Sequence, residues 1–203
     1  MIRKIVTVLL LLVIGYVVWF IALNLPGQGG PPAPAPREAS APAAAAGPKR
    51  PAANVPLPLA GQLVIPVAGV RAEQFTDTFD DSRGEGRLHG AIDIMAPRGT
   101  PVIAAAAGTV EKLFESKRGG TTVYVRRHGG QWIDYYAHLD SYAPGLAEGQ
   151  SISQSQMIGT VGSTGDASHE APHLHYAINL MAPGEAWWQG RAVNPYPMLK
   201  VGH

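Results

Sequence analysis

The chain has 203 residues, enough for one domain with attached segments or for two small domains. Its formal net charge of +1 argues against a nucleic-acid binder that relies on bulk positive charge, so we expect no nucleic-acid partner. The absence of cysteine excludes a disulfide framework, a thiol nucleophile and any cysteine-ligated zinc site. The 24 glycines and 18 prolines are spread unevenly, and they divide the chain into three segments.

The first segment, residues 1–25, is typical of a membrane anchor. Residues 5–25 are apolar and carry no charge, and a helix of that length at ~1.5 Å per residue crosses the hydrocarbon core of a bilayer. A cleaved signal peptide, the alternative, has a shorter apolar stretch and a small-residue cleavage site. Arg3 and Lys4 precede the stretch and favour a cytoplasmic N-terminus. We expect a single-pass protein of the cytoplasmic (inner) membrane, with the remainder on the periplasmic or extracellular side.

The second segment, residues 26–58, is predicted to be a linker. It contains ten prolines and ten alanines. Proline removes backbone hydrogen-bond donors, and this composition offers nothing from which a core could be built. The segment is therefore predicted to be a disordered, partly polyproline II spacer that gives the following domain its reach.

The third segment, residues 59–203, has the composition of one folded domain. It carries 11 Lys and Arg against 14 Asp and Glu. Short β-type runs recur between glycines, Gly119-Gly120 and Gly129-Gly130 are typical of hairpin turns, and no helical period is sustained after residue 58. The pattern predicts an all-β domain, an antiparallel sheet or sandwich whose loops carry the site. Examples of the expected strands are residues 63–67, 100–103, 109–114, 121–127, 132–138, 157–161 and 174–180.

Four of the seven histidines stand in contexts that suggest chemistry: His89, His138, His173 and His175. His89 and Asp93 lie four residues apart, where Gly90 favours a turn that leads into a strand, and alone this spacing is weak evidence. His173 and His175 flank Leu174, and side chains two apart on a strand point to the same face. Two imidazoles on one face are a common way to present nitrogen ligands to zinc. With His89 and Asp93 the donor count suits zinc with one open position.

His138 and the remaining three histidines give weaker signals. His138 ends the predicted strand 132–138, where it either leans toward the same site or is an ordinary hydrogen-bonded histidine. His128 beside Gly129-Gly130 is interpreted as a turn residue, His169 lies in the loop before His173, and His203 ends the chain without a signal. Tyr124, Tyr135 and Tyr176 are interpreted first as strand aromatics and second as hydrogen-bond donors to a substrate.

Four motifs in order, HGAIDIMAPRGTPVIAAAAGTV, YYAHL, GTVGSTG and APHLHYAI, resemble the lysostaphin/LytM-type zinc metallopeptidases, over roughly residues 61–199. The resemblance implies a LytM-like antiparallel sheet with a narrow groove. It makes His89, Asp93 and His175 the Zn²⁺ ligands, and His138 and His173 the catalytic histidines beside a zinc-activated water. The chain departs from the family at Ala91, where glycine is common, and in a longer stretch before His173.

The resemblance and the predicted topology together imply a membrane-anchored zinc metalloendopeptidase that hydrolyses peptide bonds in peptidoglycan stem peptides or cross-links. No HExxH motif exists, so a neutral imidazole is the available base. One alternative is a tethered peptidoglycan-binding module, or an activator of another cell-wall hydrolase without activity of its own. A serine hydrolase using Ser163 or Ser168 is disfavoured because neither lies in a GxSxG turn.

Overall fold

The computed structural model describes residues 63–83 and 86–200. The predicted anchor at 1–25 and linker at 26–58 lie outside the described residues, so both stay predictions. Within the described ranges, no helix combines the length and the apolar character that crossing a membrane requires.

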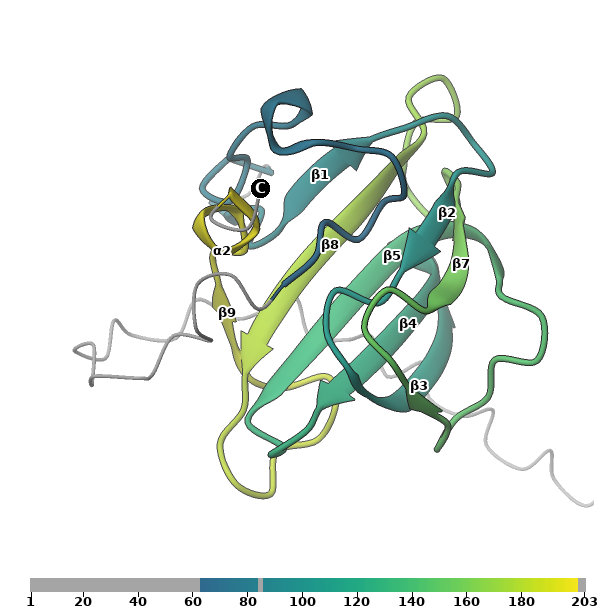
Figure 1. Ribbon diagram of the computed structural model, residues 1–203. Helices are drawn as coiled ribbons and strands as arrows, with labels where there is room; N and C mark the ends of the chain where they lie inside the picture. The colour runs from purple at the N-terminus through teal and green to yellow at the C-terminus, as the bar shows by residue number, and fades with distance from the viewer. Residues whose placement is uncertain (1–62, 84–85, 201–203) are drawn as a thin grey trace, which may run out of the picture. The chain divides into compact units, whose positions relative to one another are not determined.

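The described residues form a nine-stranded sheet in which every pairing is antiparallel, which confirms the predicted all-β fold. Figure 1 shows β1, β8, β5, β4 and β3 side by side, and β6 continues this order. Strand β7 pairs with both β2 and β5, and β9 pairs with β8. The strands are β1 (Ile92–Met95), β2 (Pro101–Ile103), β3 (Gly108–Ser116), β4 (Gly120–Arg127), β5 (Trp132–Tyr142), β6 (Ser151–Ile152), β7 (Met157–Val161), β8 (His173–Leu180) and β9 (Arg191–Val193).

Two glycine pairs make the tight connections on either side of β4, as predicted. Gly120 follows the turn from β3 into β4 with φ of 63°, and Gly129 and Gly130 connect β4 to β5 with φ of 89° and 76°. These positive values fall in the region that residues with a Cβ rarely adopt, so glycine suits the turns.

Alternation along β5 and β8 gives the sheet two unlike faces. Tyr136 pairs with Tyr176, and both side chains are fully buried in the main core. Tyr135 pairs with Ala177 one step away, and Ala137 pairs with His175. Because neighbours along a strand point to opposite faces, His175 shares its face with Tyr135 and lies opposite the core. The ring centroids of Tyr135 and His175 are 5.9 Å apart, in agreement with this placement.

Two sequence predictions are wrong at the borders of the sheet. Residues 63–67 form no strand. Val67 has an isolated bridge to Val102, Val64 N donates to Ala105 O and Pro66 O accepts from Ile103 N, but Pro66 has no N–H with which to continue a ladder. A short helix, α2 (Tyr196–Lys200), exists where no helical segment was expected, and a 3-10 turn (Ala72–Gln74) precedes β1. Five residues are too few to establish a 3.6-residue period, and α2 is held by its buried Met198 and Leu199.

Arg127 and Asp134 form a buried ion pair on the core side of β4 and β5, and we expect the loss of this pair to destabilise the domain. Arg127 Nε donates to Asp134 Oδ2 at 2.7 Å, and the two side chains are 7% and 0% exposed. Arg127→Leu leaves the Asp134 carboxylate buried without its cation, which we expect to lower the free energy of unfolding by about 3–5 kcal/mol in urea titrations. The matched control is Arg126→Leu, whose pair with Glu111 is 23% and 26% exposed, with an expected loss of about 1 kcal/mol or less. Equal losses would contradict the argument.

Candidate metal site

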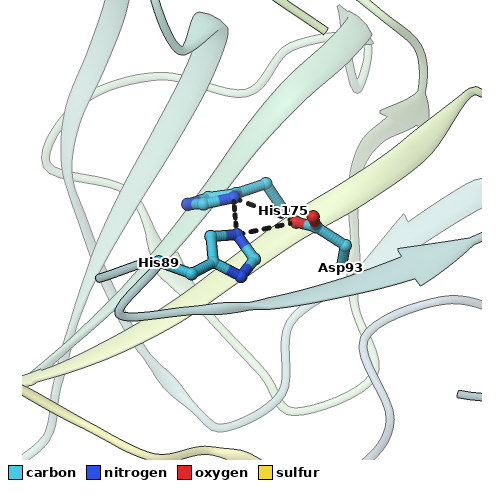
Figure 2. A group of neighbouring side chains, drawn as sticks. All are labelled: His89, Asp93 and His175. Atoms are coloured by element: carbon cyan, nitrogen blue, oxygen red, sulfur yellow. Dashed lines mark hydrogen bonds and ion pairs between the residues drawn. The ribbon is translucent and has the colours of Figure 1, made fainter. Parts of the chain in front are cut away.

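His89, Asp93 and His175 bring three ligand-type atoms together at one edge of the sheet (Figure 2). His89 Nε2 lies 2.9 Å from His175 Nδ1, and each of these nitrogens lies 3.1 Å from Asp93 Oδ1. The three atoms thus form a nearly equilateral triangle. At a Zn–ligand distance of ~2.0–2.1 Å, two ligands of a tetrahedral zinc ion are separated by about 3.3 Å. The donor set of two nitrogens and one oxygen and its spacing therefore fit a tetrahedral metal with one vertex left over.

Strand pairing explains why the three residues meet although up to 86 positions separate them. Asp93 on β1 is the direct register partner of His175 on β8, so their side chains project from the same face. His89 reaches them from the turn before β1. There His89 N donates to Asp81 O at 2.8 Å, Gly90 N donates to Phe79 O at 2.9 Å, and Gly90 has a φ of 69°.

Thr78 orients two of the three residues, and the sequence pattern did not identify it. Its carbonyl oxygen lies 2.9 Å from His89 Nδ1, and its hydroxyl accepts a hydrogen bond from Asp93 N at 3.1 Å. A carbonyl can only accept, so the His89 proton lies on Nδ1 and the lone pair of Nε2 faces the other ligands. Hydrogen bonds of this kind fix the tautomer and orientation of metal-binding histidines.

Arg83 places a positive charge beside Asp93 and His89, and this residue was also not predicted from the sequence. Its guanidinium donates to Asp93 Oδ2, and Nη2 lies 2.8 Å from His89 Nε2. Asp93 therefore offers one oxygen to Arg83 and the other to the histidine nitrogens. The only sequence signal for this role is an arginine six residues before His89, a spacing with no general meaning.

The electrostatics of the triangle favour the metal-binding protonation states. Burial alone raises the pKa of the Asp93 carboxyl, but hydrogen bonding with His175 and the attraction of the His175 and His89 rings outweigh it and hold this pKa well below its usual range. Burial lowers the pKa of His175 despite the attraction of Asp93. Asp93 is thus an anion and His175 is kept neutral, the forms in which these groups bind metals.

His173 and His138 lie beside the triangle rather than in it. His173 Nε2 is 3.8 Å from Asp93 Oδ1, and the His173 ring centroid is 5.0 Å from that of His138. His138 is 5.5 Å from His175, centroid to centroid. Each flanking ring directs Nδ1 at a backbone carbonyl 2.8 Å away, of Ala171 for His173 and of Thr164 for His138. In the neutral form, both rings therefore keep a bare Nε2.

Burial lowers the pKa of His138 to about 4, and the nearby His175 adds to the effect. The ring is neutral at neutral pH, so its Nε2 is available to accept a proton. Together, His138 and His173 place two basic nitrogens next to the candidate metal position.

Of the other residues considered in the sequence, some lie near the candidate metal site and others lie away from it. Tyr176 is buried in the core, where its hydroxyl donates to Asp134 Oδ1 at 2.7 Å, so it does not face the site. Tyr135 lies next to His175. The ring of Tyr124 packs against the ring of Tyr135, with centroids 4.6 Å apart. His128 is exposed in the turn after β4, and His169 is exposed in the loop before β8.

Residues 87–195, more than half of the chain, match the profile of peptidase family M23. The chain belongs to peptidase family M23. The matched range of this M23 chain contains all five residues predicted for the site, and the predicted resemblance to lysostaphin/LytM-type peptidases is confirmed.

Two curated relatives and one solved structure illustrate what this M23 chain is similar to. It is 35% identical over 134 residues to an L-Ala–D-Glu endopeptidase of Bacillus subtilis, covering 63% of this chain and 40% of that protein. It is 40% identical over 93 residues to the peptidoglycan DD-endopeptidase ShyC of Vibrio cholerae, covering 46% and 20%. The catalytic domain of the antimicrobial peptidase lysostaphin from Staphylococcus simulans superposes with a TM-score of 0.53 at 27% identity, covering 64% and 95%. The chain thus spans less than half the length of either curated relative.

Family membership makes a peptidase the expected class of protein, and the His-Asp-His group is a site that could bind a metal. The individual roles of His89, Asp93, His175, His138 and His173 stay predictions. The structure brings all five together, as the resemblance implied.

Proposed function

We propose that the chain is a zinc-dependent endopeptidase that hydrolyses peptide bonds in peptidoglycan stem peptides or cross-links. The triangle of His89 Nε2, Asp93 Oδ1 and His175 Nδ1 is the observation that carries the proposal, because its spacing matches three vertices of a zinc tetrahedron. The endopeptidase names of the B. subtilis and V. cholerae relatives support peptidoglycan as the substrate.

His89, Asp93 and His175 hold the zinc ion in this proposal. When bound, zinc lowers the pKa of a water toward ~7 and polarises a carbonyl group. Arg83 keeps Asp93 Oδ2 engaged, so that Oδ1 alone faces the histidine nitrogens. Thr78 keeps the Nε2 lone pair of His89 directed inward.

His138 and His173 are the proposed acid–base groups of the reaction. A neutral imidazole with a bare Nε2 accepts the proton of the attacking water, and general-base assistance of this kind contributes ~10²–10⁴-fold in rate. The ring that has accepted this proton carries an Nε2–H, which can donate to the carbonyl oxygen as negative charge develops there and can then return the proton to the departing amine. Both rings direct Nδ1 at a backbone carbonyl, so either can perform either role.

We also propose a location for the chain, based on the predicted anchor at residues 1–25 and the predicted linker at residues 26–58. An apolar anchor with its N-terminus in the cytoplasm, followed by a proline-rich spacer, would hold the domain on the side of the cytoplasmic membrane where peptidoglycan lies. Protease digestion of spheroplasts tests this topology: the domain should be cleaved in intact spheroplasts, and protection of the domain would overturn it.

Metal removal tests the activity itself. We expect the purified chain to release soluble muropeptides from isolated sacculi, to lose this activity with a chelator, and to regain it when Zn²⁺ is restored. Mass spectrometry of the released fragments identifies the bond that is cleaved. Binding to sacculi without release, in the presence of stoichiometric zinc, would instead identify a tethered binding module or an activator of another hydrolase.

A further inference from the structure

His138 faces the site against the alternation of its own strand. Tyr136 points into the core and Ala137 pairs with His175, so the next residue should return to the core face. The ring of His138 instead lies 5.0 Å from His173 and 5.5 Å from His175, on the opposite face. A local change of backbone is therefore needed to place this side chain.

A β-bulge supplies that change. The register between β4 and β5 passes from Val123↔Tyr136 to Thr121↔Leu139, which is two residues on β4 but three on β5. The extra residue bends β5 at His138, whose φ is 60°. Such a φ is uncommon for a residue with a side chain, and bulges next to active sites redirect side chains. The surrounding structure must hold this conformation in place.

Thr164, in the loop after β7, contacts the bulge through two different groups. Its hydroxyl accepts from Thr121 N at 2.9 Å and donates to Leu139 O at 2.8 Å, which links the two register partners beside the bulge. Its carbonyl oxygen lies 2.8 Å from His138 Nδ1. One residue thus connects the strands at the bulge and also orients the redirected ring.

Close packing fixes Thr164 against the β3–β4 turn. Gly119 O accepts from His138 N at 2.8 Å, and Asp166 N donates to Arg118 O at 3.0 Å. A Cβ on Gly120 would come within 2.1 Å of Thr164 Oγ1, so the loop and the turn leave no room for a side chain there. The loop that carries Thr164 is therefore packed directly against this turn, beside the bulge.

We infer that Thr164 is the positioning residue of His138: its hydroxyl holds the β-bulge that turns the imidazole to the active face, and its carbonyl fixes the ring with Nε2 bare. This inference rests on the proposed function in giving His138 a role in proton transfer. The contacts themselves involve none of the predicted metal ligands.

Substitution of the hydroxyl alone provides the test, in the full-length zinc-loaded chain. Thr164→Val replaces the hydroxyl by a methyl group of similar size, and we expect kcat on sacculi to fall at least ~10-fold, within the contribution of one general base, while KM and bound zinc stay unchanged. Thr164→Ser keeps the hydroxyl and is expected to retain most of the activity. Thr160→Val on β7 is the matched control, because Thr160 contacts Ser141 and lies outside the bulge.

A double-mutant cycle with His138→Ala separates positioning from a general structural effect. If Thr164 acts through His138, Thr164→Val should cost nothing further in the His138→Ala background. The same loss in both backgrounds would overturn the inference, as would full activity of Thr164→Val. Loss of zinc or of cooperative unfolding in Thr164→Val but not in Thr164→Ser would also count against it, because the hydroxyl would then be structural.

Imidazole ¹⁵N spectra of the zinc-free chain make the test independent of the proposed activity. We expect the native chain and Thr164→Ser to show His138 protonated at Nδ1 alone, and Thr164→Val to show an average of the two neutral tautomers. If His138→Ala keeps full activity, the proposed role of His138 in proton transfer is wrong. The spectra would still test whether Thr164 fixes the tautomer of His138. Identical His138 spectra in all three chains would overturn the inference about Thr164.

Discussion

His175→Ala is expected to abolish zinc binding and peptide hydrolysis together. His175 Nδ1 is one vertex of the triangle, at 2.9 Å from His89 Nε2 and 3.1 Å from Asp93 Oδ1. Removal of an outer-shell partner typically costs ~10–100-fold in metal affinity, so loss of a ligand itself should cost more than ~100-fold. Zinc content by atomic absorption and fragment release from sacculi measure the two effects on the same sample.

The structure supplies a matched control for this experiment. His128→Ala removes an exposed histidine in the turn after β4, and it should change neither zinc content nor turnover. Circular dichroism of the zinc-free His175→Ala chain checks that the sheet persists, because the partners of Leu174 and Tyr176 are left intact. Stoichiometric zinc or full hydrolysis in His175→Ala would contradict the assignment of this residue as a ligand.

The part of the site built on strand periodicity could be predicted from the sequence. His173 and His175 are two residues apart on β8, and both reach the site as the period of two requires. Asp93 was expected at the start of a strand and lies on β1, opposite His175. The glycines on either side of β4 were enough to predict both hairpins, because tight turns need positive φ.

The sequence could not reveal how His138 reaches the site. Strict alternation along β5 predicts that this side chain faces the core, and only the bulge at φ of 60° reverses it. The bulge depends on Thr164, which is 26 residues away and contacts His138 through a backbone carbonyl that every residue type carries. A hydrogen bond to a backbone group cannot be recognised from an amino-acid pattern. For the same reason, the contact between the Thr78 carbonyl and His89 could not be predicted.

The borders of the fold were harder to predict than its centre. The run at residues 63–67 has strand-like composition, yet it makes only scattered hydrogen bonds with residues 101–105, because Pro66 has no N–H with which to continue a ladder. Helix α2 follows Asn194, whose side-chain oxygen accepts from Tyr196 N at 2.9 Å, and it is stabilised by burial of Leu199 rather than by its own length. At α2, tertiary contacts therefore override local propensity.

His173→Ala should keep zinc and lose most of the turnover. His173 Nε2 lies 3.8 Å from Asp93 Oδ1, farther than the 3.1 Å that separates this oxygen from each nitrogen of the triangle, and so it is not needed to complete the metal site. Its Nδ1 faces Ala171 O at 2.8 Å, which leaves Nε2 for proton transfer. Loss of one acid–base group should reduce kcat by ~10²–10⁴-fold. Zinc stoichiometry and kcat on sacculi separate this outcome from that of His175→Ala.

His169→Ala is the matched control, since His169 lies exposed in the loop directly before β8 and should leave both quantities unchanged. The pair His173→Ala and His138→Ala then shows whether the two rings share one proton-transfer step. Residues that act as a unit lose about as much singly as together, so a double variant no slower than either single variant would place both rings in one step. Zinc loss in His173→Ala would instead make His173 a ligand, and the division between the triangle and its flanking histidines would be wrong.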